Sequence, residues 1–341
     1  MQRPRRANSL SGERALAKGG AELTVRKQVV RKQDSIQDFM SWLVFAFSGP
    51  VLWAISTHLD KYLVERFFKD TDVAVLVVFT ALIGLLLMPV IAVFDPSVLK
   101  RDAGSIALIG LSGILYMGAI LFYLRALQDH EASVVAPFFQ ASPLFGYALA
   151  YLVLGETLTT RQLLGGGLIL AGVLFVSVRR GPQRERFRWG LALPMLACGF
   201  VLSLSTLIFK IFAVRDEFWA TTFWMFAGEA VFGAGFLCIA HYRNQFVRLL
   251  RTNTIALLAI NGSNELINLG GGLGNRYALV SAPLSIVQAI GSTTTLFIFA
   301  LGIVLALLFP RVAREDLSTR ELVLKGIAAV LVAAGVALVT Q

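Results

Sequence analysis

The feature that most constrains this chain is a succession of apolar segments, each about 20 residues long, separated by short polar stretches. A segment of this length spans the hydrocarbon core of a bilayer when it is an α-helix. The segments are solidly apolar, whereas the strands of a membrane β-barrel would alternate. The sequence therefore predicts an all-α integral membrane protein with ten transmembrane helices. Their expected spans are residues 39–59, 73–94, 104–127, 131–154, 160–178, 189–213, 218–240, 254–277, 280–309 and 319–340.

Composition supports the same class, because only 15% of the residues are charged and the mean hydropathy is +0.71. Soluble domains carry about 25% charged residues. The net charge of +10 does not indicate nucleic-acid binding, since the basic residues lie between the apolar segments and in residues 1–38, where they would face anionic lipid. Residues 1–38 lack the apolar core of a cleavable signal peptide. We expect them to form a disordered, basic cytoplasmic tail.

A polar elbow joins two of the apolar segments at residues 155–162. Gly155 allows the preceding helix to stop. Thr159 is expected to cap the next helix, and Gln162, three residues later, completes a capping box. This capping satisfies N–H groups that would be costly at the membrane boundary.

The elbow recurs near the end of the chain. The residues EDLSTREL at 315–322 align with ETLTTRQL at 156–163, and the second copy begins at Glu315. Ser318 and Glu321 rebuild the capping box there. A repeat this specific indicates two copies of one unit.

The two copies define the expected domains, a five-helix repeat at residues 39–178 and a second at 189–340. A second shared motif, S-T-x-x-x-K, ends segments one and six. Because each half has an odd number of spans, the halves would enter the membrane from opposite sides. The sequence thus predicts an inverted five-plus-five repeat.

These residues resemble the EamA domain of the drug/metabolite transporter superfamily. The shared pattern is an apolar helix with a proline, then L-G-E-x-L-T-x-x-Q-x-x-G, then a glycine-spaced last helix. Here it consists of Pro137, Leu154, Gly155, Glu156, Leu158, Thr159, Gln162, Gly165 and Gly172. The second copy keeps Glu315, Leu317, Ser318, Glu321, Gly326 and Gly335 but has no glycine before its glutamate. The resemblance implies ten helices in an inverted repeat and secondary transport of a small metabolite through a central cavity.

The resemblance also implies that both ends of the chain are cytoplasmic. With cytoplasmic ends, most basic residues of the loops would lie outside the cell, whereas basic loop residues usually lie inside. The loop charges and the resemblance therefore disagree on the orientation.

Segment eight is the richest in polar residues. Asn261, Asn264, Glu265 and Asn268 recur at spacings of three and four, so they share one helical face. We interpret this face as lining the substrate path, with Glu265 as an ion or proton site, because polar groups at bilayer depth are costly unless they serve a purpose. The alternative is a hydrogen-bond ladder that only holds helices together. The glycines of residues 270–274 would permit close packing, bending or an unwound turn.

Three further ionisable residues lie inside apolar segments or near their inner edges: Glu229, Lys210 and Arg276. Glu229 could pair with Lys210 or Arg276. Without a partner it would stay protonated, which is the property that proton coupling requires, and both interpretations stay open. Lys210 either extends to the membrane interface or attracts an anionic group of the substrate.

Polar residues in segments four and nine complete the candidate set, namely Gln140, Ser142, Gln288 and Ser292. The resemblance places these two helices around the cavity. Their hydroxyls could instead bond back to their own helix carbonyls. Trp224 is deep enough in its segment to line a cavity, although most tryptophans here are expected at interfaces or in packing.

The elbow glutamates are assigned a structural role. Glu156 and Glu315 repeat, but they lie at the membrane edge within reach of Arg161 and Arg320. A cap or a loop salt bridge accounts for them.

We predict a secondary transmembrane transporter that exports a small metabolite, with proton coupling through Glu265 or Glu229 as a hypothesis. The alternative within transport is an uncoupled facilitator or exchanger of the same fold. The alternative from another class is an integral membrane enzyme or a non-transporting membrane scaffold. An enzyme is not expected, because such enzymes cluster carboxylates or histidines for acid–base or metal chemistry, and His58, His130 and His241 are isolated.

No cofactor, metal ion or nucleic acid is expected to bind. The expected partners are a small-molecule substrate and the lipid bilayer, and a homodimer is left open. Arginine far outnumbers lysine, which indicates a GC-rich bacterial genome and hence a bacterial cytoplasmic membrane.

Overall fold

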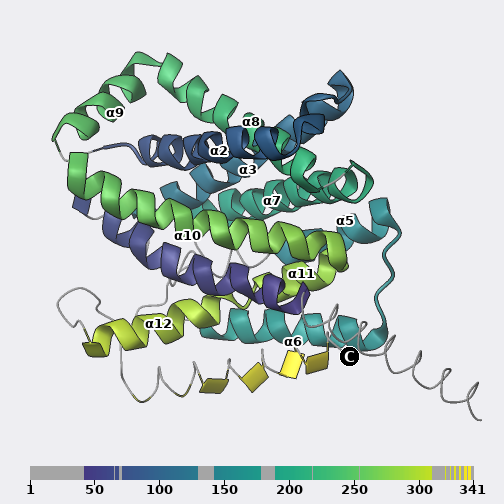
Figure 1. Cartoon of the computed structure of the whole chain (residues 1–341). Helices are drawn as coiled ribbons and strands as arrows, with labels where there is room; N and C mark the ends of the chain where they lie inside the picture. The colour runs from purple at the N-terminus through teal and green to yellow at the C-terminus, as the bar shows by residue number, and fades with distance from the viewer. Residues whose placement is uncertain are drawn as a thin grey trace, which may run out of the picture. The chain divides into compact units, whose positions relative to one another are not determined.

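The computed structural model describes residues 42–64, 66–68, 71–129, 142–177, 189–216, 218–252 and 254–308, together with scattered positions between 319 and 338. Every secondary-structure element in these residues is helical (Figure 1). The contacts described below lie within residues 45–341, which form one compact unit.

The helices follow the apolar segments closely. The first helix covers Trp42–Val64. It is followed by α2 (Ala74–Phe94), the 3₁₀ turn η1 (Pro96–Leu99), α3 (Ala103–Asp129), α5 (Ser142–Leu149) with its π-helical extension η2 (Ala150–Leu154), and α6 (Thr160–Ser177). The chain continues with α7 (Trp189–Asp216), α8 (Phe218–Cys238), α9 (Ala240–Thr252), α10 (Thr254–Ser281), α11 (Leu284–Gly291) and α12 (Thr294–Leu308).

The described part of the chain contains 6 helices that are long and apolar enough to cross a membrane. They are Trp42–Val64, Ala74–Phe94, Ala103–Gln128, Leu193–Val214, Phe218–Cys238 and Leu284–Leu305. The all-α membrane class is therefore confirmed. Residues 131–141, and most of the expected span at 319–340, lie outside the described residues.

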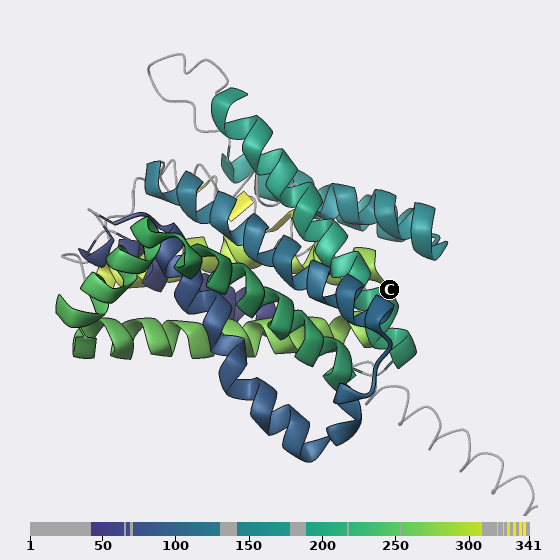
Figure 2. The ribbon, with the colours of Figure 1, turned by 90° about the horizontal axis from the view of Figure 1, so that it is seen from above.

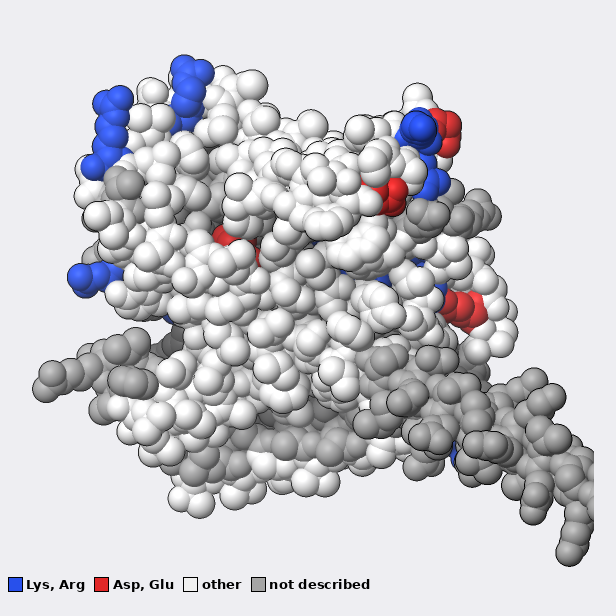
Figure 3. All heavy atoms as spheres, viewed as in Figure 1, with Lys and Arg blue, Asp and Glu red and all other residues white. Residues whose placement is uncertain are grey.

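The outer surface of α2 has the character of a membrane-facing helix. Leu86, Val93 and Phe94 are 68%, 76% and 86% exposed. Figure 3 shows a face that is mostly uncharged, with Lys and Arg side chains toward its margins. Exposed apolar side chains of this density are expected where lipid chains rather than water surround the helix.

One of these spans contains a turn. The segment predicted at 280–309 is interrupted at Ser292 and Thr293, which separate α11 from α12. The Ser292, Thr293 and Thr294 hydroxyls donate to the carbonyls of the residues three positions earlier, at 2.6, 2.7 and 2.6 Å. Such back-bonding bends helices, and for Ser292 it is the bond considered above as the alternative to a substrate contact.

The polar stretch at residues 243–253 was expected to be a connection, but it is largely the helix α9. Tyr242, Phe246 and Leu249 recur at helical spacing and pack against the core, which is the pattern of an amphipathic helix. The exposed residues of α9 include Arg243, Arg248 and Arg251.

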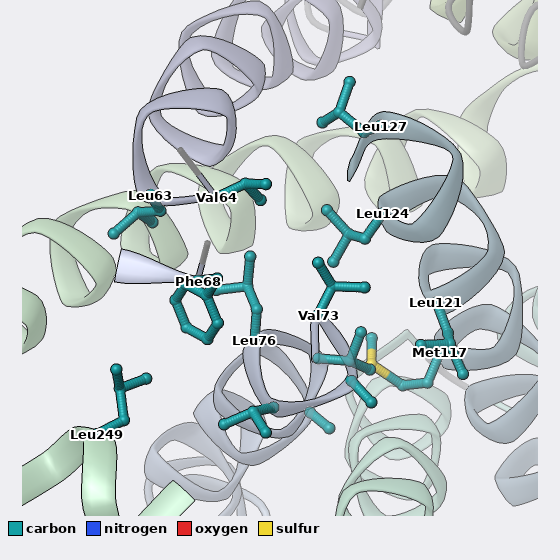
Figure 4. Packing of buried hydrophobic residues seen from close by; sticks show 14 of the residues in the cluster. Leu63, Val64, Phe68, Val73, Leu76, Met117, Leu121, Leu124, Leu127 and Leu249 are labelled. Atoms are coloured by element: carbon teal, nitrogen blue, oxygen red, sulfur yellow. The ribbon is translucent and has the colours of Figure 1, made fainter. Parts of the chain in front are cut away.

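A buried apolar cluster joins the first helix, α2, α3 and α9 (Figure 4). Its labelled members are Leu63, Val64, Phe68, Val73, Leu76, Met117, Leu121, Leu124, Leu127 and Leu249. Dense packing of this kind holds the helix ends in fixed positions. It thereby fixes the polar residues that lie further along the same helices.

Glycines bring the backbones of α3 and α8 into direct contact. A Cβ atom added at Gly113 would overlap the carbonyl of Met225, and one at Gly228 would overlap the carbonyl of Gly110. α3 also packs along α7, and α8 along α2 (Figure 2). Small residues at such contacts are the usual means by which membrane helices approach closely.

The glycine run of α10 serves the same purpose against the first helix. The run stays helical, so it does not unwind. Gly271 lies against Leu52 and Trp53, and Gly274 against Ser48. Of the three uses considered for this run, close packing is the one observed.

Candidate functional site

A cavity of about 180 Å³ lies among the helices. Its wall draws residues from the first helix and from α2, α3, α5, α7, α8, α10, α11 and α12. An engineered protein cavity of about 150 Å³ holds benzene, so a small organic molecule fits here. Its polar lining includes Ser56, Thr57, Asp60, Thr80, Ser142, Ser205, Thr206, Asn268, Asn275, Arg276, Gln288 and Ser292.

Asp60 is the one carboxylate among the described residues that line this cavity. It lies near the end of the first helix, and the Asn264 side-chain amide on α10 donates to its Oδ1 at 2.7 Å. Sequence reasoning missed Asp60, because an acid next to Lys61 at the end of an apolar segment reads as the membrane boundary. The sequence feature that could have pointed to Asp60 is its position in the repeated S-T-x-x-x-K motif, where it directly precedes the lysine.

Glu265 is buried, with 2% of its surface exposed. The Thr80 hydroxyl on α2 donates to its Oε1 at 2.6 Å, whereas its Oε2 has no hydrogen-bond partner among the described residues. Glu265 lines a smaller pocket of about 30 Å³ beside the cavity. That volume is enough for a water molecule.

The small pocket and the cavity share part of their walls. Thr80, Tyr116, Asn268, Gly272 and Arg276 line both. Glu265 therefore lies one layer behind the cavity wall. The other residues of the predicted polar face of α10 have different surroundings. Asn268 lines the cavity, and Asn264 donates to Asp60. Asn261 is buried, and its Oδ1 has no hydrogen-bond partner among the described residues.

Glu229 and Arg276 form a buried ion pair. Nη2 of Arg276 on α10 lies 2.7 Å from Oε1 of Glu229 on α8. The guanidinium also lies over the Phe226 and Phe209 rings, with its carbon 4.8 and 5.7 Å from their centroids, a favourable arrangement for a cation. Of the two partners that the sequence allowed for Glu229, Arg276 is the one observed.

Lys210 is held in an ion pair and does not stand free for a substrate anion. Its Nζ lies 2.7 Å from Oε1 of Glu156 in the elbow and donates to the Ala282 carbonyl at 2.8 Å. The same Glu156 oxygen accepts from the Leu284 backbone N–H at 3.2 Å. The expected local partner of Glu156, Arg161, is replaced by a lysine from α7, and the elbow is thereby tied to α7 and α11.

The elbow itself has the predicted local structure. Gly155 has a φ of 64° at the end of the helix, the left-handed conformation that glycine adopts readily. The Thr159 N–H donates to Oε1 of Gln162 at 3.0 Å, and the Gln162 N–H donates to the Thr159 hydroxyl at 3.3 Å. The capping box is confirmed. Its second copy, with Glu315, Ser318 and Glu321, lies outside the described residues.

The remaining candidates divide between the cavity wall and the packed interior. Ser142, Gln288 and Ser292 line the cavity. Trp224 does not, because its indole N–H donates to the Val98 carbonyl at 2.8 Å while its ring packs in an apolar cluster. Gln140 lies outside the described residues.

The groups that line this site can bind a small molecule through hydrogen bonds and charge. Hydroxyls, amides, one carboxylate and the Arg276 guanidinium line a space of small-molecule size, together with aromatic and aliphatic side chains. Within the described ranges, no group of three or more His, Cys, Asp or Glu side chains could hold a metal ion.

Comparisons with known proteins give one family match. The model of the EamA-like transporter family matches residues 40–178. The uncharacterized protein MJ1333.1 of Methanocaldococcus jannaschii is 30% identical over 130 residues, which are 38% of this chain and 90% of that protein.

A solved structure described simply as "Crystal structure of protein" has a similar fold. The match covers 88% of this chain and 96% of that one, with a TM-score of 0.62 and 16% sequence identity. At this identity the likeness concerns the fold alone.

Proposed function

The chain belongs to the EamA-like transporter family, and on this premise we propose that it is a secondary transporter that moves a small metabolite across a cell membrane by alternating access. The observation that carries the proposal is a cavity among apolar helices whose wall carries Asp60, Arg276 and several hydroxyl and amide groups. Polar groups at bilayer depth are costly and usually mark a substrate or ion path. The physiological direction proposed is export.

The proposed architecture is ten helices in an inverted repeat, and the helix contacts support it. α3 packs on α7, and the repeat-related pair, the first helix with α10, is in contact through Gly271 and Gly274. α5 packs on α7. The pair that the repeat relates to these two helices is α12 with the first helix, and a His58 ring nitrogen of the first helix lies 3.0 Å from the Ile298 carbonyl of α12. The self-related pairs α2 with α8 and α5 with α11 also pack together.

The length of one relative is consistent with this repeat. A match of 130 residues covers 90% of MJ1333.1, so that protein is about as long as one proposed half. In MJ1333.1, a chain about as long as one five-helix half is a protein by itself. Two such units in one chain would give the pseudo-two-fold arrangement of an inverted repeat.

Proton coupling is proposed at Glu265 rather than at Glu229. Glu229 has a full counter-charge in Arg276, whereas the described polar partners of Glu265 are neutral, namely the Thr80 hydroxyl and the Asn268 side chain. An unpaired buried carboxylate is costly, and binding a proton removes that cost. The other polar side chains that line its small pocket are Thr80, Tyr116, Asn268, Glu229 and Arg276, so a proton gained or lost there would act directly on the shared cavity wall.

The test is transport by the full chain in proteoliposomes. Radiolabelled amino acids, sugars, nucleosides, organic acids and organic amines are offered with and without a pH gradient. Wild type is compared with Glu265→Gln and with Asp102→Asn, a matched loss of charge at an exposed helix cap. We expect gradient-driven accumulation of one solute class by wild type and Asp102→Asn, and exchange without accumulation by Glu265→Gln.

Two results would revise the proposal. Accumulation that survives Glu265→Gln would place coupling elsewhere, or make the protein an uncoupled facilitator if the gradient has no effect on wild type. Failure of every solute class to exchange in counterflow would contradict transport itself.

A further inference from the structure

The charges that line the cavity do not balance. Arg276 is neutralised by Glu229 at 2.7 Å. Among the residues that the structure describes, Asp60 has no such partner, and the side chain that donates to it is the neutral amide of Asn264. The cavity wall therefore carries one uncompensated acidic group.

The cationic residue that the sequence offered for an anionic substrate is not free. Lys210 is paired with Glu156 at 2.7 Å and also donates to the Ala282 carbonyl. It is not among the residues that line the cavity. An anionic solute would meet the carboxylate of Asp60, and the cation that the described wall offers it, Arg276, is already paired with Glu229.

Aromatic side chains form part of the same wall. Trp53, Tyr116, Tyr123 and Phe209 line the cavity together with Asp60. The faces of such rings attract cations within about 6 Å. One of them already does so, because the Arg276 guanidinium lies 5.7 Å from the centre of the Phe209 ring.

We infer that the transported solute is a small organic cation, a protonated amine with a compact apolar body, and that Asp60 is its counter-ion in the cavity. This inference rests on the proposed transport function and narrows its substrate class. The carboxylate would hold the ammonium group, the aromatic wall would hold the body, and the volume of about 180 Å³ limits the body to roughly the size of one aromatic ring.

A second carboxylate would couple this cation to the proton. Glu265 is the neighbour in sequence of Asn264, the residue that contacts Asp60. Its unpartnered Oε2 belongs to a side chain that is 2% exposed and lines the adjoining pocket. Amine binding at Asp60 would disfavour protonation of Glu265, because a nearby cation stabilises the ionised carboxylate, and this is the antagonism that an amine–proton exchanger needs.

The test measures binding apart from transport. The probe is radiolabelled phenethylamine, bound to the detergent-purified full chain, and the competitors are a graded series of monoamines, 2-phenylethanol and 3-phenylpropionate. The variants are Asp60→Asn, which keeps the side-chain shape, Asp60→Glu, which keeps the charge, and Asp102→Asn as the control. Thermal unfolding of each variant verifies that it is folded.

We expect the amines to bind and the alcohol and acid to compete poorly. Asp60→Asn should weaken amine binding on the order of tenfold or more, because it removes one partner of a desolvated charge pair. Asp60→Glu should retain binding, and Asp102→Asn should match wild type. The inference is overturned if no amine binds, if the acid or alcohol binds better, or if folded Asp60→Asn binds amines like wild type.

Counterflow of the same compounds separates this inference from the transport proposal. Amines that bind but do not exchange would support the cation site and contradict transport. Exchange of a neutral or anionic solute that is insensitive to Asp60→Asn would support transport and overturn the cation site.

Discussion

The Arg276 guanidinium of α10 and the Glu229 carboxylate of α8 lie 2.7 Å apart with 10% and 4% of their side chains exposed. Glu229 differs in this from Glu265 and Asp60. Its described partner is a cation, whereas Glu265 and Asp60 accept from the neutral side chains of Thr80 and Asn264. Removing one member of such a pair leaves a buried charge uncompensated. Substituting Glu229 therefore tests whether this acid stabilises the fold or serves transport.

Glu229→Gln is expected to lower the free energy of unfolding by about 3–5 kcal/mol, because Arg276 would remain buried without its counter-charge. Combining Glu229→Gln with Arg276→Gln should cost less than the two single losses added together. Thermal or denaturant unfolding in detergent measures both. Normal stability of Glu229→Gln, together with loss of the response to a pH gradient, would move the coupling role to Glu229.

Two glycines of α3 should respond in opposite ways to the same substitution. Gly113→Ala places a methyl group against the backbone of α8, with an expected cost of about 1–3 kcal/mol. Gly118→Ala meets nothing within 4 Å and should be neutral or stabilising by up to about 1 kcal/mol, since alanine favours helix. Equal unfolding temperatures for the two variants would contradict the close contact of α3 with α8.

The partner of Glu156 can be identified by substitution. Lys210→Met should destabilise by about 1–3 kcal/mol, because it leaves a largely buried carboxylate without its charged donor. Arg161→Gln, at an exposed position, should have no measurable effect. The reverse ranking in a thermal unfolding assay would restore the local elbow salt bridge and exclude the link to α7.

The elbow cap should contribute measurably to stability. Thr159→Ala removes the hydroxyl that accepts from the Gln162 N–H, at a cost of about 1 kcal/mol. A double-mutant cycle with Gln162→Ala measures the reciprocal interaction. Strictly additive losses would show that the two side chains act independently and that the box makes no joint contribution.

Local patterns predicted the elements well. The capping box at Thr159 and Gln162 was predictable because its bonds join residues three apart. The polar face of α10 followed from helical spacing, since Asn264 and Glu265 are both buried in polar contacts. α9 was missed because a short helix with several arginines has too little apolar length to resemble a membrane span.

Pairing across the fold could not be predicted in the same way. Lys210 and Glu156 are 54 residues apart, and Asn264 and Asp60 are 204 apart. Nothing in the sequence around either acid selects its partner, because the choice depends on how α7 and α10 pack against other helices. For this reason Glu229 was left with two candidate partners, and the contact of Asp60 with Asn264 was not predicted.

The most direct test of the account is whether the cavity opens alternately to the two sides of the membrane. Cys198 and Cys238 are first replaced by serine, and Thr206→Cys, in the cavity wall, is compared with Ser112→Cys, which is fully buried and does not line the cavity. Membrane-impermeant thiol reagents are applied to right-side-out and inside-out vesicles. The account predicts that Thr206→Cys is labelled from either side and Ser112→Cys from neither. Labelling of Thr206→Cys from one side alone, under every gradient imposed, would contradict alternating access.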